Sequence, residues 1–142
     1  MKVKVKKLTE DAVIPRYAKA GDAGMDLTAV GVRIDQDYGY YEYDTGLAFE
    51  IPEGYVGYIF PRSSVSKTNL NLCNSVGVID SSYRGSVKLR FTPDINKSSV
   101  EYLPGDRVGQ LVIMPIPTIE LEEVGDLSTT ERGSGSFGHT GS

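Results

Sequence analysis

Hydrophobic and polar residues alternate along several short stretches of the chain. Three stretches in which every second residue is hydrophobic are Val3 and Val5, then Leu47, Phe49 and Ile51, and then Val87, Leu89 and Phe91. In the last of these, Lys88 and Arg90 occupy the intervening positions. A repeat of two residues puts the hydrophobic side chains on one face of a β-strand and the polar ones on the other. The pattern therefore predicts half-buried strands.

Turn-forming residues separate the alternating stretches. They include Pro52-Glu53-Gly54, Tyr83-Arg84-Gly85 and Pro104-Gly105-Asp106. Short strands interrupted this often predict an all-β sandwich or barrel. No long stretch repeats its hydrophobic residues at the helical period, and the best helix candidate is the short stretch from Ser63 to Leu70.

Aromatic residues gather in the segment from Arg33 to Asp44. Its four tyrosines are Tyr38, Tyr40, Tyr41 and Tyr43. Aromatic side chains on paired strands pack against one another across the pair. We therefore expect an exposed hairpin with stacked rings in this segment.

Length, composition and charge narrow the class of protein. The chain has 142 residues, of which 39% are hydrophobic and 24% charged, which fits one domain with one core. The net charge of -4, with no basic stripe, argues against a nucleic-acid binder. No hydrophobic run approaches the ~20 residues of a membrane span, and the first residues lack the apolar core of a secretory signal. We therefore expect no membrane partner and a cytoplasmic location, the host cytoplasm if the protein is viral.

Cysteine and histidine are too scarce for two common kinds of site. Cys73 is the single cysteine and His139 the single histidine, so an intrachain disulfide is excluded and a zinc site is disfavoured. Any metal ion is expected to be a hard cation held by oxygen ligands.

The end of the chain has a composition of its own. Residues 133–142 contain four glycines and three serines, which cannot bury enough surface to fold alone. Yet Arg132, Phe137 and His139 stand among them, and a lid that orders over a ligand would use such residues. We therefore divide the chain into a β-rich core, 1–131, and a Gly-rich tail, 132–142. The tail lacks the Gly-Lys-Ser/Thr ending of a Walker A loop.

Two internal segments carry candidate chemistry. Pro61-Arg62-Ser63-Ser64 follows a strand-like run. A guanidinium and two hydroxyls at the end of a strand are suited to binding phosphate oxygens. A motif this short also occurs in ordinary turns. Asp80 ends a hydrophobic run and precedes a polar turn. A partly shielded carboxylate there suits a general base, and an aspartate that caps a tight turn is an equally good reading.

Taken together, five segments resemble the ordered motifs of the trimeric dUTPase family. They are Ala20–Leu27, Pro61–Ser64 with Lys67 following, Gly77–Gly85, Pro104–Leu111 and Arg132–Gly141. Their order and spacing match the family, and they span nearly the whole chain. The resemblance implies a jelly-roll-like β domain in a homotrimer with shared active sites. In each site one subunit would supply the first, second and fourth motifs, another the third, and the remaining subunit the tail, closed over its neighbour's site.

The resemblance also implies the reaction. It is hydrolysis of dUTP to dUMP and pyrophosphate by water attack at the α-phosphate, which limits uracil in DNA and supplies dUMP for thymidylate synthesis. Asp80 matches the residue that activates the water. Asp26 matches a carboxylate that acts on Mg²⁺ through water, with the triphosphate as the main chelator. The residues that match the grip on the triphosphate are Arg62, Ser63, Ser64 and Gln110, with Ser63 at the α–β bridging oxygen.

Recognition of the nucleoside is implied for two further segments. Asn74 matches a uracil contact, together with backbone groups of Gly77, Val78 and Ile79. Tyr83 matches the ring under the deoxyribose, which leaves no room for a ribose hydroxyl. In the tail, Phe137 matches the residue that stacks on uracil. Arg132 and Thr140 match residues that reach the γ-phosphate, and Gly138 and His139 lie beside them.

Two other readings differ from this one. The dCTP deaminases share the Arg-Ser-Ser and Ile-Asp segments but carry a catalytic glutamate in a Thr-Leu-Glu run, where this chain has Lys88-Leu89-Arg90. Arginine cannot shuttle the proton, so deamination is disfavoured. A regulatory protein that uses the tyrosine-rich segment as a partner surface is the other reading, but every presumed catalytic position is filled. Loss of turnover on Asp80→Asn distinguishes an enzyme from a regulatory protein.

Overall fold

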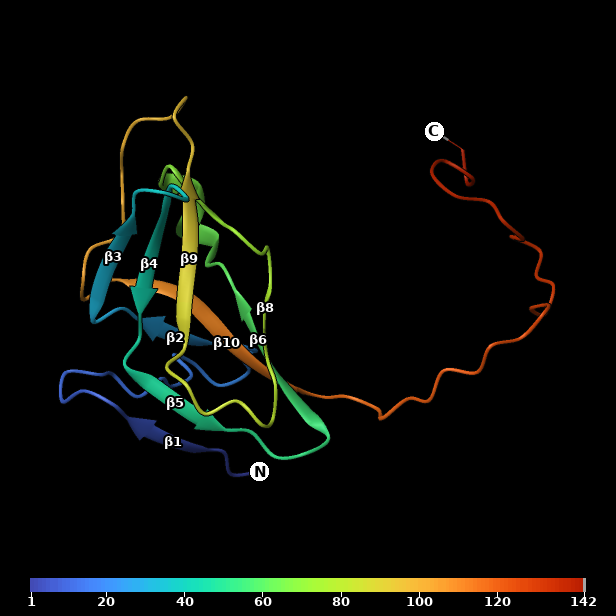
Figure 1. The fold of residues 1–142 in the computed structure, drawn as a ribbon, viewed down its shortest axis with the longest axis horizontal. Coiled ribbons are helices and arrows are strands. Elements are labelled where there is room, and N and C mark those ends of the chain that lie inside the picture. Colours follow the sequence, from blue (N-terminus) through green and yellow to red (C-terminus); the bar gives the residue numbers. More distant parts are fainter. Residues whose placement is uncertain (142) are drawn as a thin grey trace.

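The computed structural model describes residues 1–141 and confirms the all-β prediction (Figure 1). The elements are β1 (Lys4–Lys7), β2 (Met25–Thr28), β3 (Gly31–Asp35), β4 (Tyr40–Asp44), β5 (Leu47–Glu50), β6 (Tyr55–Phe60), the short 3-10 helix η1 (Ser63–Lys67), β7 (Leu70–Leu72), β8 (Gly77–Ile79), β9 (Lys88–Pro93) and β10 (Arg107–Pro115). In the part of the chain that is described, no helix is long and apolar enough to cross a membrane.

Antiparallel pairing joins the strands into three sheets. One four-stranded sheet has the order β2-β10-β6-β8, the other the order β3-β4-β9-β7, and β1 pairs with β5. The hydrophobic positions of the period-two stretches point into the core, where Leu47, Leu89 and Phe91 are buried. Lys88 and Arg90 point outward, as the alternation predicts.

The tyrosine-rich segment forms the expected hairpin of β3 and β4. Tyr38 and Tyr40 stack at the tip with ring centroids 6.5 Å apart. The expectation of an exposed hairpin is wrong for β4, because Tyr43 is fully buried. Its ring meets Phe91 and Tyr102 edge-on, at 5.7 and 5.9 Å between centroids. Strand alternation, which sends Tyr43 inward and Glu42 outward, accounts for the difference.

The helix candidate is shorter than expected. The 3-10 helix covers Ser63–Lys67, and the Thr68 hydroxyl then donates to the Val65 carbonyl at 2.7 Å. Leu70 already pairs with Pro93 in the sheet. Serine and threonine hydroxyls compete for backbone groups in this way, which shortens helices.

An extended arm follows the β body. Within the described residues no strand or helix follows Pro115, and the chain runs away from the sheets along one side (Figure 1). Its last backbone link to the body is the hydrogen bond from the Ile116 amide to the Gly54 carbonyl, 2.8 Å. Residues 116–131, assigned to the core from the sequence, therefore lie along the arm. The arm exposes the hydrophobic residues Ile119, Leu121, Val124, Leu127 and Phe137.

Candidate functional site

Pairing in the β2-β10-β6-β8 sheet brings three of the five motifs together. Gln110 on β10 lies opposite Asp26 on β2 and opposite Phe60 on β6. The chain then turns from Phe60 into Pro61 and Arg62. Antiparallel register alone therefore aligns Asp26, Gln110 and Arg62 at one end of this sheet.

We call Asp26, Arg62, Ser64, Arg107 and Gln110 the Arg62 cluster. The guanidinium of Arg62 holds Asp26 in a forked pair, with Nε 2.9 Å from Oδ1 and Nη2 3.3 Å from Oδ2. Arg107 Nη1 donates to the same carboxylate at 3.1 Å. Arg62 Nη1 also donates to the Ser64 hydroxyl at 3.0 Å. Two guanidinium groups thus converge on one partly buried carboxylate, and one of them also holds the Ser64 hydroxyl.

Gln110 is fixed from two sides. Its side-chain amide donates to the Pro61 carbonyl at 3.0 Å. A Cβ atom at Gly24 would lie 2.5 Å from the Gln110 Oε1 atom, so a larger residue at position 24 would push the end of the Gln110 side chain aside. Gly24, Asp26 and Gln110 line one small cavity together with Arg16 and Asp22. The predicted grip on an anion is therefore assembled in the chain, apart from Ser63, whose side chain is exposed beside it.

A second cavity opens between the edge strands of the two large sheets, β8 and β7, and we call it the β7–β8 slot. Its lining residues are Ile59, Leu72, Cys73, Asn74, Gly77, Val78, Ile79, Lys88, Leu89 and Arg90. Ser75, in the turn between the strands, has a φ of 61°. A Cβ atom at Gly77 would lie 3.0 Å from that of Ile59, so the backbone passes close to β6. The slot therefore unites the residues expected to contact uracil.

Asp80 follows β8 immediately and is exposed. The partial shielding expected for its carboxylate is not found in the single chain, and among residues 1–141 no hydrogen bond or ion pair to it occurs. Its main-chain carbonyl accepts the Tyr83 amide at 3.0 Å, which closes a tight turn. The Tyr83 hydroxyl donates to the Ser86 carbonyl at 3.0 Å, and its ring lies over Gly85. Tyr83 is therefore fixed, whereas the Asp80 carboxylate is open.

The same chain keeps Asp80 apart from Arg62. In the antiparallel pair of β6 and β8, Ile79 lies opposite Gly57 and Gly77 lies opposite Ile59. Asp80 thus continues toward the Tyr55 end of β6, while Arg62 follows its Phe60 end. Val56 and Phe60 are separated by about 13 Å at the rise of a strand. The predicted base and the predicted phosphate grip therefore lie at opposite ends of β6.

The predicted tail residues join neither group in the single chain. Arg132 Nε donates within the tail to the Gly135 carbonyl at 2.9 Å, and Phe137 is fully exposed. Gly138 has a φ of 75°, and His139 and Thr140 follow it in a local turn.

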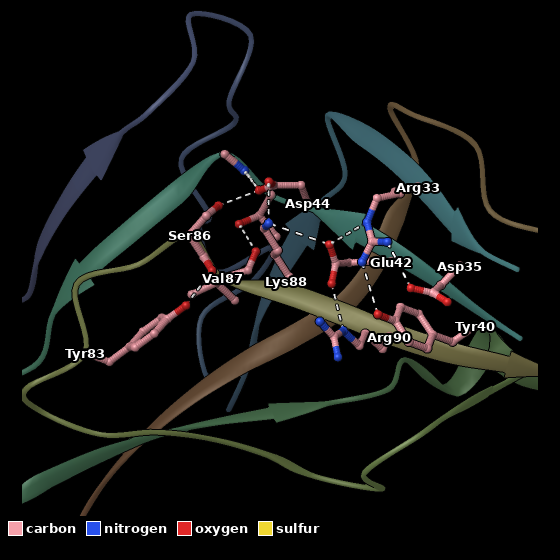
Figure 2. A network of polar contacts seen from close by, with 12 residues as sticks. Arg33, Asp35, Tyr40, Glu42, Asp44, Tyr83, Ser86, Val87, Lys88 and Arg90 are labelled. Carbon is pink, nitrogen blue, oxygen red and sulfur yellow. Dashed lines mark hydrogen bonds and ion pairs between the residues drawn. The ribbon is translucent and has the colours of Figure 1, made fainter. Parts of the chain in front are cut away.

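Sequence reasoning assigned no role to several residues that the structure links to these groups. Arg107 belongs to the Arg62 cluster, and the signal for it was a charged residue inside the fourth motif. On the outer face of the β3-β4-β9-β7 sheet, the Glu42 carboxylate accepts hydrogen bonds from Arg90 Nε at 2.7 Å and from Arg33 Nε at 3.4 Å. The same carboxylate lies 3.6 Å from Lys88 Nζ (Figure 2). The sequence feature that could have indicated this network is the charged residue at every second position of β3, β4 and β9.

Side chains that could coordinate a metal ion are few and scattered among the described residues. Among the described residues, no group of three or more histidine, cysteine, aspartate or glutamate side chains lies close enough to hold one. In the Arg62 cluster, Asp26 supplies oxygen atoms of the kind that a hard cation prefers, but both are occupied by arginines. This arrangement fits the expected mode of binding, in which the triphosphate holds most of the cation and Asp26 contacts it through water.

Known proteins resemble this chain over nearly its full length. A sequence model of the dUTPase family matches residues 10–141. The deoxyuridine 5'-triphosphate nucleotidohydrolase of Hydrogenobaculum sp. is 42% identical over 145 residues, covering 99% of each chain. The protein of the same name from Cutibacterium acnes is 40% identical, covering 90% of this chain and 85% of that one.

Solved structures agree with the sequence comparison. The dUTPase of Staphylococcus bacteriophage 80alpha, solved with dUPNHPP, superposes with a TM-score of 0.83 at 31% identity, covering 99% of both chains. A mutant dUTPase from phage phi11 of S. aureus, described for its coordination of a structural Mg(II) ion, gives 0.74 at 28% identity over 89% of this chain and 98% of that one. By sequence and by fold, this chain belongs to the dUTPase family.

Proposed function

We propose that the protein hydrolyses dUTP to dUMP and pyrophosphate. The observation that carries the proposal is the Arg62 cluster, an anion-binding group assembled from three of the family's motifs in a chain that belongs to that family. The reaction would limit uracil in DNA by removing dUTP, and it would supply dUMP for thymidylate synthesis.

The Asp80 carboxylate is the proposed general base. It accepts a proton from water, whose oxygen attacks the α-phosphorus, and the bond from that phosphorus to the α–β bridging oxygen breaks. A positioned base of this kind accelerates a reaction by about 10²–10⁴-fold. Ser63 donates to the bridging oxygen as negative charge develops on pyrophosphate, while Arg62, Ser64 and Gln110 hold the phosphate oxygens.

Nucleoside recognition is assigned to the β7–β8 slot and the tail. Asn74 and the backbone of Gly77, Val78 and Ile79 contact uracil. The fixed ring of Tyr83 packs under the deoxyribose, where it excludes a 2′-hydroxyl. In the tail, Phe137 stacks on uracil, Arg132 and Thr140 contact the γ-phosphate, and Gly138 and His139 lie beside them.

Two features of the chain support the proposed homotrimer with shared sites. Asp80 and Arg62 lie at opposite ends of β6, which supports a site whose base and phosphate grip come from different chains. The arm exposes a row of hydrophobic side chains that one chain leaves uncovered. Such residues favour burial against another copy, which would bring the tail, 132–142, over a neighbouring site.

Mg²⁺ is the proposed cofactor, held mainly by the triphosphate with Asp26 acting through water. When bound, the ion would neutralise phosphate charge. The protein's part is to keep Asp26 oriented between Arg62 and Arg107.

The reaction is tested by incubating the protein with Mg²⁺ and each nucleoside triphosphate in turn, with pyrophosphate release as the readout. Release from dUTP alone is expected. Deoxyuridine products from dCTP would assign the protein to the deaminases, and no turnover by an intact trimer would favour a regulatory protein.

The shared site is tested by mixing two inactive variants, Asp80→Asn and Arg62→Ala, through unfolding and refolding. If different subunits supply the two residues, roughly one quarter of the sites in randomly mixed trimers regain both. Activity therefore returns on mixing, whereas neither variant regains it when refolded alone. A mixture that stays inactive although mixed trimers form would contradict the shared site.

A further inference from the structure

The loop between β8 and β9 is attached to β4 by hydrogen bonds that the reaction described above does not use. The Ser86 hydroxyl donates to Oδ1 of Asp44, the last residue of β4 (Figure 2). The main-chain carbonyl of Ser86 accepts the Tyr83 hydroxyl at 3.0 Å. These contacts therefore connect the β3-β4-β9-β7 sheet to the ring that is proposed to lie under the deoxyribose.

We propose that Asp44 and Ser86 are positioning residues that fix the Tyr83 ring and thereby set the preference for deoxyribose over ribose. This role rests on the proposed function, in which Tyr83 lies under the sugar. A ring excludes a 2′-hydroxyl only if it cannot move aside, because this hydroxyl is a single small group. Exclusion of this kind requires a side chain whose position is fixed by packing and by hydrogen bonds.

Asp44 is itself held in place before it meets Ser86. The Gly46 amide donates to its Oδ1 atom at 2.8 Å, the contact by which an aspartate stabilises a turn. The amino group of Lys88 lies 3.7 Å from Oδ2. On the sheet, Asp44 lies opposite Gly31 of β3 and opposite Lys88 of β9. The carboxylate is therefore a fixed acceptor for the Ser86 hydroxyl.

The loop has little other attachment to the body. Residues 80–86 lie in no strand or helix. Among residues 1–141, no other hydrogen bond joins a side chain of this loop to a different part of the chain. The backbone is held again from Val87, whose amide donates to the Leu47 carbonyl at 2.8 Å. The position of Ser86 therefore depends on its hydroxyl.

The Tyr83 ring moves with Ser86, because its contacts are to the same stretch of backbone. A Cβ atom at Gly85 would lie 2.7 Å from the ring carbon Cζ, so the ring lies against the backbone just before Ser86. Tyr83 is 43% exposed, so the hydrophobic core does not hold it. A shift of Ser86 is therefore transmitted to the ring.

The hydrogen bond between Ser86 and Asp44 is of a strong kind. A hydroxyl that donates to a carboxylate makes a charge-assisted hydrogen bond, roughly twice as strong as one between neutral groups. Both residues are half-buried, which limits competition from water. Removal of the hydroxyl is therefore expected to loosen the loop.

Three variants separate this role from a general one. Ser86→Ala removes the hydroxyl that binds Asp44 and keeps the carbonyl that binds Tyr83. Asp44→Ala removes the acceptor of the same hydrogen bond. Ser82→Ala is the matched control, because it makes the same substitution in the same loop at an exposed serine.

The test measures kcat/KM for dUTP and for UTP with Mg²⁺, from pyrophosphate release. One hydrogen bond to a charged group corresponds to roughly a tenfold change in an equilibrium constant. We expect Ser86→Ala to raise kcat/KM for UTP, relative to that for dUTP, by about this factor, and Ser82→Ala to retain the wild-type ratio. Asp44→Ala is expected to give the same change, and the double variant no more, because both substitutions remove one contact.

Two results would overturn the proposal. One is a wild-type ratio in folded Ser86→Ala, including a variant that loses turnover of both nucleotides equally, as a structural residue would. The other is a double variant whose change is the product of the two single changes. Thermal unfolding and trimer mass verify folding, and Asp44→Ala is measured alone if Ser86→Ala does not fold. A wild type that releases no pyrophosphate from dUTP would instead contradict the proposed function.

Discussion

The two carboxylates proposed to act on the substrate, Asp26 and Asp80, have opposite surroundings. Asp26 is held by Arg62 and Arg107 and lies on β2, which pairs with β10. Asp80 stands exposed at the end of a three-residue strand. The Arg62 cluster is thus preorganised within one chain, while the Asp80 loop and the tail present their side chains to solvent. In the single chain, one half of the proposed site is therefore already assembled, and the other half is open.

This difference has an energetic consequence. A residue of the Arg62 cluster is expected to contribute to folding as well as to binding, because its removal leaves charged partners without their contacts. A residue of the Asp80 loop or the tail is expected to contribute to catalysis alone. Measuring activity and stability on the same variants therefore separates the two halves.

Asp80→Asn is expected to have the largest effect on turnover. The amide keeps the shape of the side chain but cannot accept the proton from water, so kcat for dUTP falls by about 10²–10⁴-fold. Because the side chain is exposed, the unfolding temperature stays unchanged. Steady-state pyrophosphate release and thermal unfolding measure the two effects.

The neighbouring Ser82→Ala is the control for that variant, since Ser82 is also exposed and has no proposed part in the reaction. It is expected to retain wild-type kcat. An Asp80→Asn enzyme with substantial turnover would remove Asp80 from the role of base, and one that unfolds earlier would contradict the contrast with Asp26.

Asp26→Asn is expected to alter both quantities. Two guanidinium groups lose their shared counter-charge, so the free energy of unfolding falls by ~1–3 kcal/mol. The Mg²⁺ concentration for half-maximal activity rises by about 10- to 100-fold, the usual effect of removing an outer ligand partner. Urea unfolding and a Mg²⁺ titration of turnover measure these changes. Loss of activity at unchanged stability would mean that the Arg62 cluster is not part of the folded framework.

Phe137→Ala is expected to weaken substrate binding without affecting the body. Stacking of an aromatic ring on a base contributes ~1–3 kcal/mol, so KM for dUTP rises roughly tenfold. The side chain is fully exposed in the arm, and thermal unfolding of the body is therefore unchanged. Phe137→Tyr keeps the stacking surface and is expected to retain the wild-type KM. Equal KM values for the alanine and tyrosine variants would exclude stacking.

The contrast also explains what the sequence could predict. The alternation of hydrophobic and polar residues located the strands at residues 47–51 and 87–91, because this pattern depends only on residues that are neighbours along the chain. The motif residues Asp26, Arg62 and Gln110 were named, and register then brought them together. The separation of Asp80 from Arg62 was not predictable from spacing, because it depends on which end of β6 meets β8. The network around Glu42 joins positions far apart in the chain, so only folding reveals it.

Glu42→Gln tests whether preorganisation extends to the outer face of the second sheet. Burial raises the pKa of Glu42, but hydrogen bonds from Arg90 and Arg33 and the charge of Lys88 outweigh burial, and the pKa is lowered overall. The charged carboxylate therefore stabilises the fold, with the full contribution present above the unfolded-state pKa of about 4.3. That contribution is lost as the pH falls through the lower pKa of the folded state.

We expect Glu42→Gln to lower the free energy of unfolding by ~1–3 kcal/mol at pH 7, because three cations lose one nearly buried partner. The difference from the wild type should shrink as the pH is lowered below about 4.3, the ordinary glutamate value. Urea unfolding across this range measures it. Glu50→Gln, which breaks only the exposed pair with Lys4, is the control and should change stability less. A difference between Glu42→Gln and wild type that does not vary with pH would mean that shape, rather than charge, holds Arg90 in place.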